Sequence, residues 1–376
     1  MLERKQTEPN LSRYLHNRGA RLGLPIGGNF ELTARCNFNC PMCYVHLKQE
    51  DVEARGRELT AAQWIDLARQ ARDAGMVFVL LTGGEPFIRE DFFEIYHAMK
   101  QMGLMISINS NGSMLHGETL RRLIEDPPFR MNISLYGGSN ETYRRMCGQN
   151  AYDRVVENIR ALRQAGIDVR LNVSLTPYNH QDLELICRTA EELGVHMKAT
   201  GYMYPSIRVN GGQYGCGDRL SPSVAADVDV RWDLLRYDAE TFAQRAKAMK
   251  ELSLVEESEC ALDLDEGVRC RAGSSAFWMT WDGRMLPCGM MPYPTVYPLE
   301  TGFSAAWEEL RKQTRQIRTS PECAACPKRK VCPSCAAVCI TETGRFDGRP
   351  DYVCRMTDET IRRTWEAYRE RKNDED

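Results

Sequence analysis

Residues 30–43 have the sequence FELTARCNFNCPMC, in which a short apolar segment runs directly into three closely spaced cysteines. The segment Phe30–Thr33 is predicted to be a β-strand, which places the cysteines on the loop after it. Three thiolates on one loop can bind three irons of a cubane cluster and leave the fourth iron open. A structural zinc loop is the alternative, with His46 as a fourth ligand, because zinc sites usually have four. The three cysteines are Cys36, Cys40 and Cys43.

Downstream of this loop the chain alternates apolar runs with helical patterns. Strands are predicted at 30–33, 76–81, 105–109, 131–135, 169–175 and 195–199. Helices are predicted between them at 60–74, 91–101, 117–125, 151–165 and 181–193. Such alternation indicates βαβ units and a parallel sheet. Because there are six units and a closed barrel needs eight, we predict an α/β fold, a partial (β/α)6 TIM-type barrel with its site at the C-terminal strand ends.

The second part of the chain differs in composition. Nine of the fifteen cysteines lie between residues 260 and 354, among glycine and proline turns. We therefore expect a small cysteine-rich α+β domain after the barrel. The predicted divisions are a lead-in at 1–27, the barrel at 28–222, a helical linker at 223–257 and the cysteine-rich domain at 258–376.

The composition narrows the class of protein. The formal net charge is −3, and no long basic stretch favours a nucleic-acid or membrane partner. No apolar run approaches a membrane span, and the first residues lack the apolar core of a signal peptide. A cytoplasmic location is thus expected. Thiols stay reduced there, so closely spaced cysteines indicate metal binding and not disulfides.

A second motif follows the second predicted strand. Gly83, Gly84 and Glu85 form a GGEP sequence with Pro86, one βα unit after the cysteine loop. Together with the CxxxCxxC spacing and Tyr44 beside the last cysteine, it resembles the radical S-adenosylmethionine (SAM) superfamily. The resemblance implies a [4Fe–4S] cluster whose open iron binds the methionine end of SAM. It also implies that the GGE backbone and carboxylate receive the amino group, consistent with glycines permitting close approach and carboxylates pairing with ammonium groups.

The chemistry implied by this resemblance is radical chemistry. One electron cleaves SAM, and the 5′-deoxyadenosyl radical abstracts hydrogen from an unactivated carbon. The resemblance also suggests contacts to the cofactor's ribose and carboxylate at the ends of the next strands. Asn109 and Ser134 are the candidates for these contacts, with Arg144 or Arg145 for the carboxylate.

The later cysteines resemble the SPASM domain, an auxiliary-cluster module of the same superfamily. This resemblance implies two further [4Fe–4S] clusters, and hence three in all. The first would be held by Cys270, Cys288 and either Cys335 or Cys339, with Cys335 preferred, and Cys260 could complete it. The second would be held by Cys323, Cys326, Cys332 and Cys354. A pair of zinc ribbons is the alternative, because CxxC is also a zinc spacing.

SPASM-type enzymes mostly modify peptides or proteins, so we expect a radical peptide maturase that installs a crosslink or an oxidation. Oxidation or rearrangement of a small metabolite is one alternative, and a zinc-binding scaffold is another. A sulfatase maturase that makes formylglycine is less favoured, because Gly289 and not an acid follows Cys288. The expected partner is a flavodoxin- or ferredoxin-type reductant, and a separate precursor-recognition protein is a further candidate. Tyr202, Tyr204 and Arg208 follow the sixth strand and are the candidate substrate contacts.

Overall fold

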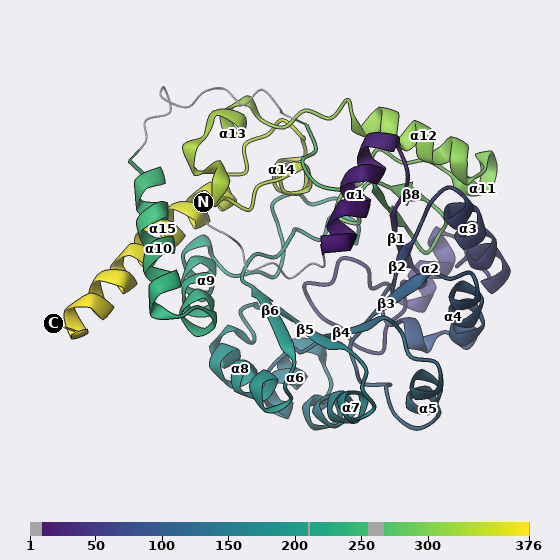
Figure 1. Ribbon diagram of the computed structural model, residues 1–376, viewed down its shortest axis with the longest axis horizontal. Helices are drawn as coiled ribbons and strands as arrows, with labels where there is room; N and C mark the ends of the chain where they lie inside the picture. The colour runs from purple at the N-terminus through teal and green to yellow at the C-terminus, as the bar shows by residue number, and fades with distance from the viewer. Residues whose placement is uncertain (1–9, 210, 255–266, 376) are drawn as a thin grey trace.

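Eight strands form one sheet in the computed structural model, which describes residues 10–209, 211–254 and 267–375 (Figure 1). Their order across the sheet is β6-β5-β4-β3-β2-β1-β7-β8. All neighbouring strands are parallel except β7 and β8, which are antiparallel. The strands are β1 (Gly27–Glu31), β2 (Phe78–Thr82), β3 (Met105–Ser110), β4 (Arg130–Ser134), β5 (Val169–Ser174), β6 (His196–Thr200), β7 (Ala276–Met279) and β8 (Met285–Leu286).

Helices connect the parallel strands and cover one face of the sheet (Figure 1). The first of them is capped by Thr60, whose hydroxyl and the Gln63 side chain form a reciprocal capping box. These helices are α3 (Ala61–Asp73), α4 (Phe92–Gln101), α5 (Gly117–Glu125), α6 (Asn140–Cys147), α7 (Tyr152–Gln164) and α8 (Leu183–Glu192).

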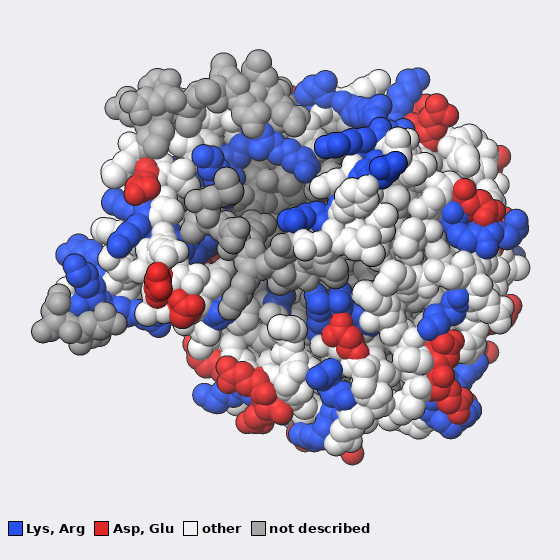
Figure 2. All heavy atoms as spheres, in the orientation of Figure 1, with Lys and Arg blue, Asp and Glu red and all other residues white. Residues whose placement is uncertain are grey.

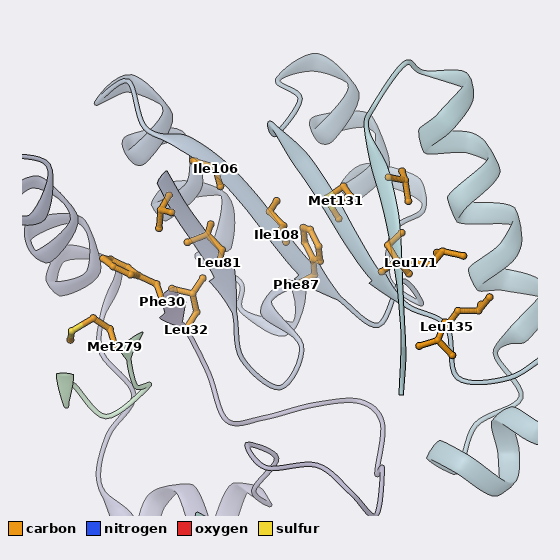
Figure 3. Close-up of a cluster of buried hydrophobic side chains, with 14 of the residues drawn as sticks. Phe30, Leu32, Leu81, Phe87, Ile106, Ile108, Met131, Leu135, Leu171 and Met279 are labelled. Atoms are coloured by element: carbon orange, nitrogen blue, oxygen red, sulfur yellow. The ribbon is translucent and has the colours of Figure 1, made fainter. Parts of the chain in front are cut away.

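The two faces of the sheet differ in polarity. Strands β3 and β4 bury every second residue, and these residues form the core between sheet and helices (Figure 3). Successive side chains of a strand point to opposite faces, so the residues between them lie on the other face. Asn109, Asn132 and Asn172 occupy that face, and Asn172 is exposed. The concave side of the partial barrel is therefore polar and open, as a site for a polar cofactor requires.

Of the remaining helices, α2 lies between β1 and α3, and the others precede or follow this βα array. Short 3-10 turns lie at η1 (Pro86–Ile88), η2 (His180–Asp182) and η4 (Pro327–Lys330). The helices are α1 (Asn10–Leu22), α2 (Gln49–Arg55), α9 (Pro222–Arg236), α10 (Ala239–Leu252), α11 (Pro298–Thr301), α12 (Phe303–Thr314), α13 (Pro321–Ala325), α14 (Ala336–Thr343) and α15 (Asp351–Glu375).

The predicted α/β fold is confirmed, and each of the six predicted strands is present within a few residues of its expected bounds. Two strands were not predicted. β7 pairs in parallel with β1, with Gly27 opposite Ala276, and β8 follows it. The cysteine-rich part of the chain therefore contributes to the same sheet as the barrel. No helix within the described ranges is long and apolar enough to cross a membrane.

Candidate active site

The loop with Cys36, Cys40 and Cys43 lies at the C-terminal end of β1, as predicted. Its start is tied to β2 by the Leu32 amide, which donates to the Thr82 carbonyl at 2.8 Å. Its first half is anchored by Phe38, a buried side chain whose ring packs against two tyrosines of neighbouring elements. The three thiols are partly buried. The loop is therefore a fixed part of the sheet edge.

Burial disfavours the charged form of these thiols, and it raises the pKa of Cys36 to about 12. Backbone amides nevertheless point at the sulfurs: Phe38 N lies 3.4 Å from Cys36 Sγ, and His46 N lies 3.2 Å from Cys43 Sγ. A metal cluster would deprotonate such thiols, and the amides would then stabilise the resulting charge. The donor set fits an iron–sulfur cluster.

The thiols are not arranged for a single metal ion. Within residues 10–209, 211–254 and 267–375, no three His, Cys, Asp or Glu side chains are placed to share one ion. The ligands of a cubane cluster need not converge, because each binds a different iron.

The glycines of the GGEP motif face the backbone that leads into the cysteine loop. A Cβ on Gly83 would lie 2.5 Å from the Thr33 carbonyl oxygen, and one on Gly84 would lie 2.2 Å from the Arg35 oxygen. Two hydrogen bonds join the same segments, from Gly84 N to Thr33 O at 2.8 Å and from Glu85 N to Arg35 O at 2.9 Å. The glycines thus let Glu85 lie directly beside the cysteine loop.

Glu85 is completely buried, and hydrogen-bond donors surround its carboxylate. Ser110 Oγ donates to both oxygens at 3.0 and 3.1 Å, and the amide of Asn111 donates at 2.8 Å. The carboxylate forms no ion pair with any residue of the described part of the chain, and burial raises its pKa to about 7. A buried carboxylate without a counter-charge is suited to receive an ammonium group.

Asn111 connects Glu85 to the cysteine loop. Its side-chain amide lies 3.7 Å from Cys36 Sγ and donates to Asn37 Oδ1 at 2.8 Å. Sequence reasoning selected Asn109 on the same strand-end segment and missed both Ser110 and Asn111. The signal that could have found them is their place at the C-terminal end of β3, where Ser110 is the last strand residue and Asn111 follows it, since polar residues there face the site at the C-terminal ends of the strands.

Two of the predicted cofactor contacts lie on strands, and a third lies on a helix. Asn109 and Ser134 lie on the polar concave face, where Asn109 bonds to Asn132 at 3.0 Å and to Thr82 at 3.4 Å. Arg145 is exposed on α6. That helix reaches the cysteine loop through a 3.1 Å hydrogen bond from Asn39 N to Cys147 O.

A buried polar network joins Tyr44 and the chain after β6. Arg208 forms a two-pronged ion pair with Glu31, at 2.7 and 2.9 Å, although Glu31 has no exposed surface. The indole nitrogen of Trp278 donates to the same carboxylate at 2.9 Å, and the Tyr44 ring lies 6.5 Å from the Trp278 ring. Arg208, predicted to contact substrate, is thus engaged with a buried carboxylate.

A second site is a cavity of about 470 Å³ in the cysteine-rich part of the chain. Its walls contain every auxiliary cysteine that was predicted within the described residues, while Cys260 lies outside them. Cys335 lines the cavity, whereas Cys339 does not line it and is completely buried. The lining cysteines are Cys270, Cys288, Cys323, Cys326, Cys332, Cys335 and Cys354.

Two tyrosines after β6 lead toward this cavity. Tyr204 lines it, and its hydroxyl lies 4.0 Å from Cys335 Sγ. The Tyr202 ring packs against Tyr204 at 5.0 Å, but Tyr202 is buried and its hydroxyl donates to Glu342 at 2.8 Å. Of the three predicted substrate contacts, Tyr204 is the one that lines this cavity.

Comparison with known proteins assigns the class of the chain. Residues 30–190, which contain both the cysteine loop and the GGEP motif, match the radical SAM superfamily. These residues are therefore a radical SAM domain, and the protein is an enzyme. The class implies SAM and a [4Fe–4S] cluster as cofactors, in agreement with the site described above.

Similar sequences include enzymes of more than one activity. The chain is 25% identical over 337 residues to the AdoMet-dependent heme synthase of Methanosarcina barkeri, an alignment that covers 84% of this chain and 93% of that protein. It is 32% identical over 179 residues to a probable GTP 3′,8-cyclase of Saccharolobus solfataricus, covering 47% of this chain and 56% of that protein. The chain thus spans little more than half the length of the cyclases it matches.

Similar solved structures extend beyond the radical SAM domain. Streptococcus suis SuiB superposes with a TM-score of 0.66 at 18% identity, over 94% of this chain and 85% of SuiB. The enzyme anSMEcpe with bound AdoMet superposes with a TM-score of 0.64 at 14% identity, over 94% of this chain and 100% of anSMEcpe. At these identities the likeness shows that nearly the whole fold is shared.

Proposed function

We propose that this protein is a radical SAM peptide maturase with auxiliary clusters, which crosslinks or oxidises a ribosomally made peptide. The observation that carries the proposal is the cavity lined by seven cysteines beside a radical SAM domain. Two enzymes with this fold support the choice of substrate, since SuiB was crystallised with the precursor peptide SuiA and anSMEcpe with the Cp18Cys peptide.

In this proposal Cys36, Cys40 and Cys43 hold the SAM-binding cluster, and Glu85 receives the amino group of SAM. When bound, the cluster and SAM together supply a 5′-deoxyadenosyl radical that abstracts hydrogen from the substrate. The chain's own residues bind and orient the reactants. Tyr44, Asn109, Ser134 and Arg145 are proposed to contact SAM, while Gly83 and Gly84 keep Glu85 against the cysteine loop.

The seven cavity cysteines are proposed to hold two auxiliary [4Fe–4S] clusters of the SPASM type. Cys270, Cys288 and Cys335 would bind the first, completed by Cys260 or left with an open iron. We assign Cys335 and not Cys339, because only Cys335 lines the cavity. The second cluster would be held by the remaining four lining cysteines, as the spacing predicts.

The structure adds an argument against a formylglycine-generating sulfatase maturase. Such an enzyme would carry an acidic base at the position of Gly289, directly after Cys288. A Cβ at Gly289 would lie 2.7 Å from the Trp278 ring, so an acidic side chain there would have to displace the tryptophan. Trp278 is in turn held by its hydrogen bond to the buried Glu31.

The experiment is co-expression with the short open reading frames found beside the gene, with and without any neighbouring small recognition protein. The modified peptide should lose about 2 Da, which corresponds to two hydrogen atoms removed by radical oxidation or crosslinking. The enzyme with Cys36, Cys40 and Cys43 replaced by Ala is the control and should leave the mass unchanged. An unchanged mass with fully loaded wild-type enzyme would contradict the peptide assignment.

A second candidate is a reaction on a small metabolite. It is favoured by the similarity to an AdoMet-dependent heme synthase, which extends over 84% of this chain. Incubation of the loaded enzyme with heme precursors and reductant separates the two candidates: product formation there, without any peptide mass change, would establish the second.

Cytoplasmic location and the four domain divisions, 1–27, 28–222, 223–257 and 258–376, remain part of this proposal. The pairing of β7 with β1 means that the last of these segments, 258–376, shares a sheet with the barrel segment.

A further inference from the structure

Five arginines form a basic surface on α1 and α12 and on the turn that follows α12. Figure 2 shows Lys and Arg side chains gathered over α1 and the adjoining end of α12, at the top of the view. Four of the five are exposed and Arg311 is half-buried. We call this group the arginine patch: Arg18, Arg21, Arg311, Arg315 and Arg318.

The patch has few compensating negative charges. Helix α1 has three arginines and no acidic residue, and residues 310–320 contain four basic residues and no acidic one. Within the described part of the chain, none of the five arginines forms an ion pair. Burial and the charge of Arg315 both lower the pKa of Arg311, a sign of crowded like charges. This excess of positive charge stands out because the whole chain has a net charge of −3.

The patch borders the cavity of the auxiliary cysteines. The end of α12 packs on the segment after Cys270, where a Cβ at Gly273 would lie 2.4 Å from Thr314 Oγ1. Arg318 directly precedes Thr319, a lining residue of the cavity, and Cys323 follows in α13. Helix α1 is joined to α12 by the indole nitrogen of Trp307, which donates to the Gly23 carbonyl at 2.7 Å.

The patch is not placed to serve the radical site directly. Helix α1 leads into the N-terminal end of β1, whereas the loop of Cys36, Cys40 and Cys43 follows its C-terminal end. A substrate bound to the patch would thus lie at the end of the sheet opposite the cysteine loop, too far for hydrogen abstraction. A protein that delivers electrons to the auxiliary clusters would instead lie beside the cavity that holds their cysteines.

From this position and charge, and resting on the proposed function, we propose that the arginine patch docks an acidic one-electron carrier protein. In the complex, the carrier is oxidised by one electron and a [4Fe–4S] cluster held by the auxiliary cysteines is reduced by one. Charge complementarity steers such an encounter and makes its rate depend on ionic strength. No covalent bond forms, and no proton is transferred.

The experiment measures cluster reduction by stopped flow, with acidic flavodoxin hydroquinone as donor and the fully reconstituted enzyme as acceptor. The test variant is Arg18→Glu, Arg21→Glu and Arg315→Glu. The matched control is Arg154→Glu, Arg160→Glu and Arg188→Glu, which reverses three exposed arginines on α7 and α8 that form no ion pair with any described residue. Dithionite, a small reductant, reports whether the clusters of each variant are intact.

We expect the test variant to lower the second-order rate with flavodoxin at least tenfold at low salt and to remove most of its salt dependence. The control should remain within about twofold of wild type, and SAM cleavage with dithionite should be equal in all three proteins. Equal flavodoxin rates in wild type and test variant would overturn the proposal. The proposal would also be overturned if the only defect of the test variant were a raised KM for peptide, or if it were a loss of nucleic-acid binding. Absent SAM cleavage with dithionite in wild type would instead refute the proposed function.

Discussion

Glu85 is enclosed by three hydrogen-bond donors but by no cation among the described residues. This arrangement stabilises a negative charge that burial otherwise disfavours, and the two effects leave the pKa at about 7. A ligand that brings an ammonium group supplies the missing counter-charge. We therefore predict that the site favours SAM over analogues without the amino group.

Replacing Glu85 with Gln is expected to weaken SAM binding about 10- to 100-fold, because a hydrogen bond to a charged group contributes about 1.5–3 kcal/mol. In the wild type, affinity should also fall as the pH drops below about 7, since the protonated carboxyl must lose its proton to pair with the ammonium. The Gln variant should lack this dependence. Anaerobic equilibrium dialysis with the reconstituted enzyme at pH 6 and pH 8 measures both effects, and a wild-type affinity that is flat in pH would contradict them.

Gly84 has no space for a side chain, because its Cβ would collide with the Arg35 carbonyl of the segment that leads to Cys36. Gly84→Ala should therefore displace the cysteine loop and reduce the iron bound after reconstitution. The control is Gly27→Ala, in which the added methyl meets no backbone among its nearest neighbours, only the His16 side chain at 3.0 Å and the Ala276 methyl at 3.9 Å. Equal iron content and equal SAM cleavage in both variants would show that the loop tolerates the displacement.

At the scale of elements, helix α9 carries a carboxyl group that opposes folding at neutral pH. Asp229 accepts a 3.3 Å hydrogen bond from the Gly201 amide just beyond β6, and burial raises its pKa to about 6. A carboxyl whose folded-state pKa is raised prefers to fold protonated. Its unfavourable contribution therefore grows as the pH rises from about 4 to about 6 and is complete above that.

Asp229→Asn keeps an oxygen for the Gly201 amide and removes the charge. We expect the variant to be more stable than wild type by roughly 1–3 kcal/mol at pH 7.5, and by less at pH 5. Thermal unfolding followed by circular dichroism at both pH values tests this. Asp233→Asn is the contrasting variant, because Asp233 is ion-paired with Arg236 and Arg245, and it should lower the melting temperature. A stability gain for Asp229→Asn that is larger at pH 5 than at pH 7.5 would contradict this prediction.

At the scale of the whole molecule, two cysteine sites lie on one shared sheet. Reconstituted wild type should bind about twelve irons if three cubane clusters form. Replacing Cys323 and Cys326 with Ala should remove about four of them and leave the SAM-binding cluster in place. Iron and sulfide analysis with Mössbauer spectroscopy provides the count, and zinc in place of iron would support the scaffold alternative.

The same count distinguishes Cys335 from Cys339. Cys335→Ala should lose iron or change the spectrum of one auxiliary cluster, because its thiol lines the cavity. Cys339→Ala should keep the full iron content, because its thiol is buried in α14 outside the cavity wall. The opposite result would reassign the ligand.

The sequence by itself determined the alternation of strands and helices in the barrel and the position of the first cysteine loop after β1. Helix caps, strand periodicity and the CxxxCxxC spacing are local, and local signals can be read along the chain. Only the tertiary structure decided that β7 joins β1, that Asn111 and Ser110 surround Glu85, and that Arg208 pairs with Glu31. These contacts join residues 25 to 249 positions apart, and no local pattern encodes which distant partner satisfies a buried polar group.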